Sequence, residues 1–204
     1  MQNPIILDDF LDYMETIKGT SPNTAKEYYY DLKTFFKFMK IRYALVKENV
    51  EFEDIDISDV DIDFIRKINI QDLYAFMSFL DKKKDNVNST RSRKVASLRS
   101  FFKYLTDKVN LLEKNPAAQL EFPKIESRHP TYLTLDQALN LLEIVSQNSN
   151  EYFRKRDYCI ITLFLNCGLR LSELASIDVD SFNGKDTLTV IGKGNKERTV
   201  FLNE

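Results

Sequence analysis

The apolar periodicity of the first 109 residues is the feature that most constrains what this chain can fold into. In four segments apolar side chains recur every three or four residues, a spacing that predicts amphipathic helices. These segments span about residues 5–17, 20–40, 69–83 and 88–109, and Ser/Thr or Asn residues stand at the start of the last three as N-caps. The pattern predicts one four-helix domain around a single core. The acidic segment 51–63, EFEDIDISDVDID, reads as a loop or a short irregular excursion.

Prolines divide the chain after this helical region. Pro116, Pro123 and Pro130 favour extended backbone, so residues 113–131 are predicted to be a linker between a domain of residues 1–112 and a second unit of residues 132–204. The second unit is expected to contain a capped helix, a buried apolar helix, a short helix and a β-hairpin, at residues 134–146, 156–167, 171–177 and 186–202.

The net charge of −2 and the pI of about 5.6 argue at first against a nucleic-acid-binding protein. The average conceals two opposite blocks, because residues 51–63 hold seven acids and no base, whereas residues 82–108 hold nine bases and two acids. Screening limits electrostatic reach to about 10 Å, so a local basic face can attract phosphates whatever the total charge. A solvated helix face is the alternative reading of the basic block.

The remaining composition favours a cytoplasmic protein. Only two cysteines are present, no apolar run approaches the roughly 20 residues of a membrane span, and the N-terminus MQNPIILDDF is acidic where a signal peptide is basic. A disulfide scaffold and a membrane association are therefore not expected.

Two motifs in the second unit carry chemistry. Residues 166–174 read NCGLRLSEL, residues 191–198 read IGKGNKER, and 23 positions separate Arg170 from Lys193. The first resembles the catalytic-arginine motif of the tyrosine recombinase (phage integrase) family, and the second resembles that family's catalytic β-hairpin. SPNTAKEYYYDLKTFFKFM, NSTRSRKVASLRSFFKYL and NPAAQLEFPKIESRHPTYLT are similar to its second and fourth core-binding helices and its interdomain linker. The resemblance covers essentially the whole chain and is strongest to Xer-like members.

The resemblance implies a mainly α fold, with a SAM-like four-helix core-binding domain followed by the α+β start of a catalytic domain. It implies a site-specific recombinase that cuts and rejoins DNA through a 3′-phosphotyrosyl intermediate, with neither a cofactor nor a metal. The expected partner is double-stranded DNA, on which the full-length protein assembles as a homo- or hetero-tetramer, and no small-molecule substrate is expected. Chromosome-dimer resolution, phage integration and transposon excision share these motifs, and the Xer-like pattern favours the first.

The resemblance also assigns roles to particular residues. Arg170 matches the first catalytic arginine, which neutralises charge on the phosphorane, and Lys193 matches the lysine that protonates the leaving oxygen. Glu173 is expected to orient Arg170. A structural ion pair for Arg170 and Glu173 and a plain surface position for Lys193 are the alternatives. The candidate DNA contacts include Arg91, Arg93, Lys94, Arg99 and Lys103 on the fourth helix, and Thr20, Ser21 and Asn23 at a helix start that could equally be a plain cap. Lys196 and Arg198 on the hairpin either contact phosphates or support the hairpin.

The family's second arginine, in a His-x-x-Arg motif, and its nucleophilic tyrosine are expected downstream of the hairpin. The one histidine, His129, lies in the predicted linker, and none of the ten tyrosines follows the hairpin. Two hypotheses follow. The chain is either a truncated recombinase that is inactive alone, or a naturally short, non-catalytic DNA-binding or assembly module.

Overall fold

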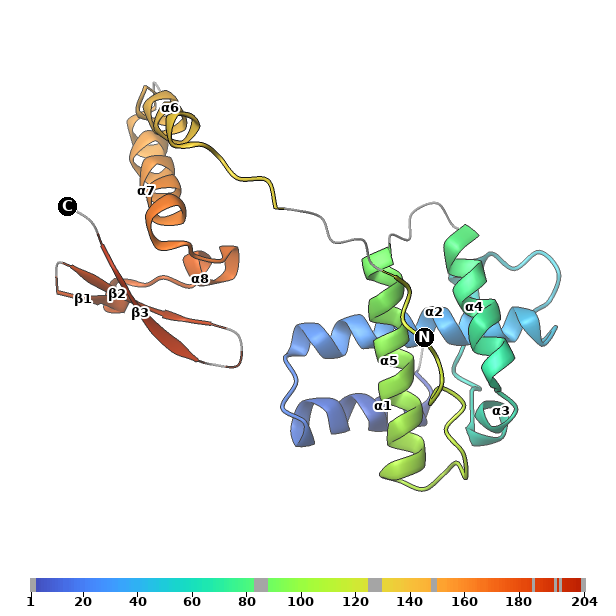
Figure 1. Ribbon diagram of the computed structural model, residues 1–204. Coiled ribbons are helices and arrows are strands. Elements are labelled where there is room, and N and C mark those ends of the chain that lie inside the picture. The colour runs from blue at the N-terminus through green and yellow to red at the C-terminus, as the bar shows by residue number, and fades with distance from the viewer. Residues whose placement is uncertain are drawn as a thin grey trace. The chain divides into compact units, whose positions relative to one another are not determined.

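The computed structural model describes residues 3–82, 88–124, 130–147, 150–184, 186–192, 194 and 196–202. The chain divides into two compact units, residues 1–127 and residues 128–204 (Figure 1). The prediction of a mainly helical fold with a C-terminal hairpin is confirmed.

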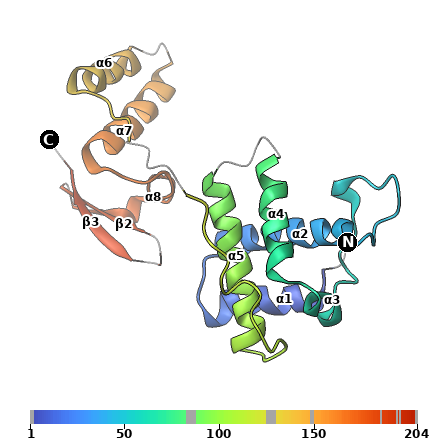
Figure 2. The ribbon, with the colours of Figure 1, turned by 45° about the vertical axis from the view of Figure 1, so that its right-hand side comes forward.

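The first unit contains the four predicted helices and one short additional helix. In Figures 1 and 2, α1 and α2 run side by side, α5 crosses both of them, and α4 crosses α2. The bounds are α1 Ile5–Asp12, extended by a π-helical turn Tyr13–Ile17, α2 Pro22–Arg42, α3 Ile62–Arg66, α4 Ile70–Lys82 and α5 Asn88–Asp107.

The residues before α2 show why the helical conformation is interrupted between the first two helices. Gly19 has a φ of +61°, a conformation that costs glycine little because it has no Cβ. The Ser21 hydroxyl then accepts a hydrogen bond of 3.3 Å from the backbone N–H of Thr24, and Pro22 occupies the first helical turn, where no N–H is needed. The predicted cap is therefore present.

Phenylalanine rings form the centre of the first unit. The rings of Phe35 and Phe76 meet edge to face at 5.1 Å, and those of Phe10 and Phe101 meet in the same way at 5.3 Å. All four side chains are inaccessible to solvent. Since they come from α2, α4, α1 and α5, this cluster joins the four long helices into one core.

The acidic segment has the expected irregular backbone, and it is also packed against the core of the first unit. It forms a 3-10 turn at Phe52–Asp54 and leads into α3, and Ile55, Ile57 and Val60 between its acids are buried. Apolar and acidic residues alternate here, so one side of the segment faces the core while the other faces solvent.

Two lysines of α2 neutralise part of this acidic segment. The Lys37 ammonium donates a 2.6 Å hydrogen bond to the Glu53 carbonyl oxygen. The Lys40 ammonium donates to the Asp56 carbonyl at 2.9 Å and to the Asp59 carboxylate at 2.6 Å. Both lysines are buried, which the amphipathic pattern of α2 does not predict.

The chain packs against the first unit beyond residue 112, where the domain was expected to end. Leu112, Ala117 and Leu120 belong to the buried core, and the Asn115 side chain accepts a 2.8 Å hydrogen bond from the Ala117 backbone N–H. The first half of the expected linker is thus a fixed part of the helical unit.

The second unit combines three helices with a small antiparallel sheet. β2 pairs with both other strands, and Thr187 faces Phe201 while Ile191 faces Glu197 across the hairpin. The bounds are α6 Leu135–Ser146, α7 Glu151–Cys167, α8 Leu171–Ala175, a 3-10 turn Val179–Ser181, β1 Phe182–Asn183, β2 Thr187–Ile191 and β3 Glu197–Phe201. The short β1 was not predicted.

The prediction that the apolar helix α7 is buried is wrong for this structure. No residue of α7 is fully buried, and Tyr158 and Leu165 are 43% and 38% exposed. Leu163 and Phe164 are partly covered by the small core of Leu169, Leu188, Val190 and Val200. In the described part of this unit, α6 and that small core cover only a portion of the helix circumference.

Within the described ranges, no helix is both long enough and apolar enough to cross a membrane.

Candidate functional site

Arg170 and Glu173 are brought together by the local turn that connects α7 to α8. Gly168 ends α7 with a φ of +57°, and Arg170 is the N-cap of α8. The Glu173 carboxylate accepts a 2.9 Å hydrogen bond from the Arg170 backbone N–H through Oε2, and a 2.7 Å hydrogen bond from Arg170 Nη1 through Oε1. An acid three residues into a helix is placed to bond back to its N-cap, so the Arg-x-x-Glu spacing specifies this contact.

The β-hairpin reaches the same carboxylate from the other side. Arg198 of β3 donates from Nη2 to Glu173 Oε2 at 2.9 Å. A Cβ built on Gly192 would lie 3.3 Å from Glu173 Oε1 and 3.4 Å from the Lys196 carbonyl oxygen. Glycine at position 192 therefore lets the turn approach the pair closely, and its N–H closes the turn with a 2.7 Å hydrogen bond to that carbonyl.

The electrostatics of the site keep Glu173 ionised. The hydrogen bond from the Arg170 backbone N–H, followed by that from the Arg198 guanidinium, lowers the pKa of Glu173 to about 2. Its side chain is 1% exposed, whereas the side chains of Arg170 and Arg198 are 69% and 41% exposed. One buried carboxylate between two guanidinium groups leaves a net positive charge and an open donor edge on Arg170, which suits an anionic ligand.

Lys193 and His129 lie outside the described residues. Gly192, which precedes Lys193 in the chain, is described and lies beside the Arg170–Glu173 pair. Lys196, on the other side of the turn, is exposed.

On the basic helix α5, the candidate DNA contact Lys94 does not face solvent. Lys94 is buried, and its Nζ lies 2.9 Å from Oδ1 of Asp31 on α2, which is also buried. Burial raises the pKa of Asp31, an effect opposed by the hydrogen bond and charge of Lys94 and by Arg93. Arg93 pairs with both Asp31 and Glu27. Nothing in the apolar pattern of α5 pointed to Asp31, which lies 63 residues away in the chain.

The other basic candidates on α5 differ in how far they are engaged. Arg91 pairs with Asp81 and with the side chain of Asn88. Arg99 donates to the Leu120 carbonyl at 3.1 Å, and its side chain remains exposed, as does that of Lys103. Arg99 and Lys103, one helical turn apart, are the outward-facing cations of this helix.

At the start of α2, two of the three candidate contacts serve local structure. The Thr20 hydroxyl donates to the Met14 carbonyl at 2.7 Å, and the Ser21 hydroxyl forms the helix cap. Asn23 is exposed.

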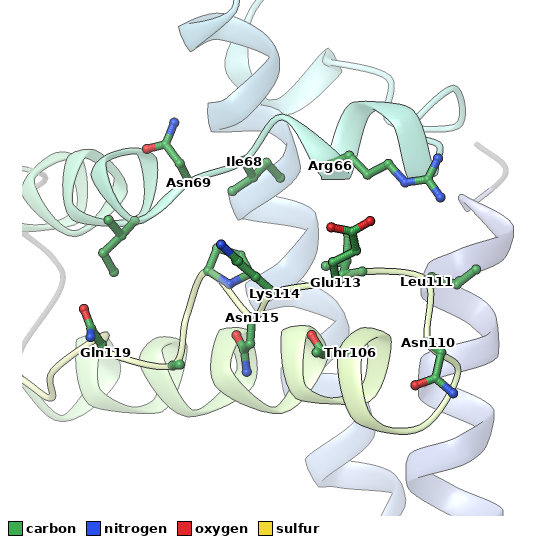
Figure 3. A pocket seen from close by; sticks show the side chains of 14 residues that line it. Arg66, Ile68, Asn69, Thr106, Asn110, Leu111, Glu113, Lys114, Asn115 and Gln119 are labelled. Carbon is green, nitrogen blue, oxygen red and sulfur yellow. The ribbon is translucent and has the colours of Figure 1, made fainter.

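A cavity of about 1150 Å³ lies between the α3–α4 junction and the segment after α5 (Figure 3). Its lining includes Arg66, Asn69 and Asn115, whose side chains already have partners within the protein. Arg66 pairs with Asp63, and the side-chain oxygens of Asn69 and Asn115 accept backbone N–H groups. None of the predicted site residues within the described ranges lines this cavity.

Comparisons with known proteins agree with this fold. Residues 131–204 match the phage integrase family. The chain is 52% identical over 204 residues to tyrosine recombinase XerC of Caldanaerobacter subterraneus subsp. tengcongensis, covering all of this chain and 56% of the relative. It is 34% identical over 194 residues to tyrosine recombinase XerC of Leptospira interrogans, covering 95% of this chain and 56% of the relative. The chain thus spans little more than half the length of these curated relatives.

Two solved structures share the fold. The XerH site-specific recombinase bound to its difH substrate gives a TM-score of 0.59 at 18% identity, covering 99% of this chain and 67% of that one. A lambda integrase dimer bound to a COC′ core site gives 0.60 at 17% identity, covering 96% and 62%. A helical unit followed by an α+β unit is therefore a fold that this chain shares with recombinase structures. Residues 131–204 thus contain a phage integrase domain, and over its whole length the chain is similar to tyrosine recombinases of the XerC type.

Proposed function

We propose that this chain is the DNA-binding part and the first catalytic part of a site-specific recombinase that cuts and rejoins duplex DNA. The observation that carries the proposal is the exposed Arg170 guanidinium, held by the buried carboxylate of Glu173 beside the turn of the hairpin. The XerH and lambda integrase structures with the same fold contain DNA, which supports DNA as the partner.

The proposed reaction is a transesterification at a phosphodiester. A tyrosine hydroxyl loses its proton to solvent and its oxygen bonds to phosphorus. The bond from phosphorus to the 5′ oxygen breaks, and that oxygen leaves with a proton supplied by Lys193. Arg170 donates hydrogen bonds to the phosphoryl oxygens as negative charge accumulates on them, and Glu173 fixes its orientation. We assign the attacking tyrosine to the family segment that follows the hairpin.

The proposed DNA surface of the first unit is smaller than the basic stretch of α5. It consists of the outward cations Arg99 and Lys103, with Asn23 at the start of α2, and Lys196 adds a cation from the hairpin. Assembly of the whole protein as a tetramer on two duplexes, and its use in chromosome-dimer resolution, belong to the same proposal.

Duplex binding tests the DNA part of the proposal. Fluorescence anisotropy with a labelled duplex, at salt concentrations from about 50 to 200 mM, is expected to show affinity falling steeply with salt. The variant R99E/K103E should bind more weakly and with a shallower salt dependence. Charge reversal at the exposed Lys47 is the matched control, since it alters the total charge without touching α5. Binding that does not depend on salt, or that is equal in both variants, would contradict the proposal.

A further inference from the structure

We propose that Arg198 is a positioning residue that couples the β-hairpin to Arg170 through Glu173. Its consequence for strand transfer rests on the proposed function, whereas the coupling itself is a property of the protein without DNA.

The two oxygens of Glu173 divide between local and hairpin contacts. Oε1 accepts from Arg170 Nη1 at 2.7 Å, and Oε2 accepts from both the Arg170 backbone N–H and Arg198 Nη2 at 2.9 Å. The same Nη2 of Arg198 lies 3.4 Å from the carbonyl oxygen of Gly168. Arg198 therefore contacts the chain on both sides of Arg170, before it and after it.

The register of the sheet explains why Arg198 points towards this carboxylate. Arg198 is paired across the hairpin with Val190, and Val200 lies two residues further along β3. Both valines are buried in the small core of the second unit. Side chains on a strand alternate between faces, so Arg198 shares the core-facing side with Val200, while Glu197 and Thr199 lie on the other side.

The carboxylate needs this third donor because it is almost fully withdrawn from solvent. A buried carboxylate is stable only when its oxygens are hydrogen-bonded and its charge is balanced. Arg198 supplies both from the hairpin, and a planar guanidinium can reach two acceptors where an ammonium is a single point charge. At the turn itself, the space that a Cβ at position 192 would occupy lies 3.3 Å from Glu173 Oε1, so Gly192 permits a close approach but supplies no hydrogen bond to the carboxylate from a side chain.

Arg198→Gln, Arg198→Lys and the matched control Lys196→Gln separate this role from a phosphate contact. Lys196→Gln removes the same charge from the same hairpin, but the Lys196 side chain is exposed. The readouts, taken without DNA, are the Glu173 carboxyl titration by ¹³C NMR, assigned with Glu173→Gln, and hydrogen exchange of the Arg170 and Gly192 amides.

We expect Arg198→Gln to raise the pKa of Glu173 by about 1 unit or more and to speed exchange of both amides about tenfold. Arg198→Lys should give smaller changes in the same directions, and Lys196→Gln should change neither. If Arg198→Gln fails to fold, Arg198→Lys is tested instead. The proposal would be overturned if Arg198→Lys changed neither the pKa of Glu173 nor the exchange rates of the Arg170 and Gly192 amides.

A role as a phosphate contact gives a different pattern. Arg198→Gln and Lys196→Gln would then weaken salt-dependent duplex binding equally, with the pKa of Glu173 and the amide exchange unchanged, and the positioning role would be wrong. Because titration and exchange are measured without DNA, a failure of the proposed DNA function would leave these results intact.

Discussion

The ammonium of Lys94 lies 2.9 Å from the carboxylate of Asp31, and these two side chains are only 9% and 1% exposed. This pair joins α5 to α2 inside the helical unit. The cations of α5 therefore have different roles. Lys94 holds two helices together, whereas Arg99 and Lys103 face outward.

Removing one partner of this pair is expected to be costly. Asp31→Ala leaves Lys94 buried without its counter-ion, which should lower the free energy of unfolding by about 3–5 kcal/mol in urea denaturation. The double variant Asp31→Leu/Lys94→Met should lose much less, since neither charge remains. Asp63→Ala, which breaks the exposed pair with Arg66, is the control and should cost less than about 1 kcal/mol. Equal losses in Asp31→Ala and the control would show that the buried pair is not stabilising.

The same double variant tests whether Lys94 contributes to DNA binding. Because its ammonium is buried against Asp31, Asp31→Leu/Lys94→Met should bind duplex DNA with unchanged affinity and an unchanged salt slope. Anisotropy titrations beside R99E/K103E provide the comparison. A smaller salt dependence of duplex affinity in the double variant would show that Lys94 contributes to DNA binding.

Stability of the second unit should depend on acid pH through Glu173. The pKa of Glu173 is lowered from an ordinary 4.5 to about 2, so its ionised form stabilises the folded state fully above about pH 4.5. That contribution is lost as the pH falls towards 2. The difference in thermal midpoint between the wild type and Glu173→Gln should therefore be largest above pH 4.5 and shrink below it. Glu197→Gln, on the exposed side of β3, serves as the control, and a pH-independent difference for Glu173→Gln would contradict the assignment.

Position 192 should tolerate no side chain without disturbing the site. A Cβ there would lie 3.3 Å from Glu173 Oε1 and 3.4 Å from the Lys196 carbonyl, so one of them must move. Gly192→Ala should destabilise the second unit by about 1–3 kcal/mol and Gly192→Val by more, as in other overpacked sites. Thermal unfolding with hydrogen exchange of the Arg170 amide measures both effects. An unperturbed Gly192→Val protein would refute the close approach.

Local patterns determined much of this protein. The cap at Ser21, the left-handed turn at Gly168 and the hairpin of β2 and β3 each depend on residues close together in the chain, so the sequence predicts them. The Arg170–Glu173 contact belongs to the same group, because three residues separate its partners and the start of a helix brings them together.

Tertiary structure alone decided which charged side chains are exposed and available to bind a partner. Lys94 on α5 and Lys37 and Lys40 on α2 sit in basic or amphipathic patterns that predict exposure, yet partners 16 to 63 residues away bury them. Arg198 likewise contacts a carboxylate 25 residues away, and strand register directs it there. Periodicity indicates which face of a helix or strand is apolar. It does not indicate whether an acidic side chain from a distant part of the sequence packs against that face. Such an acid determines whether a cation pairs within the protein or remains free to bind DNA.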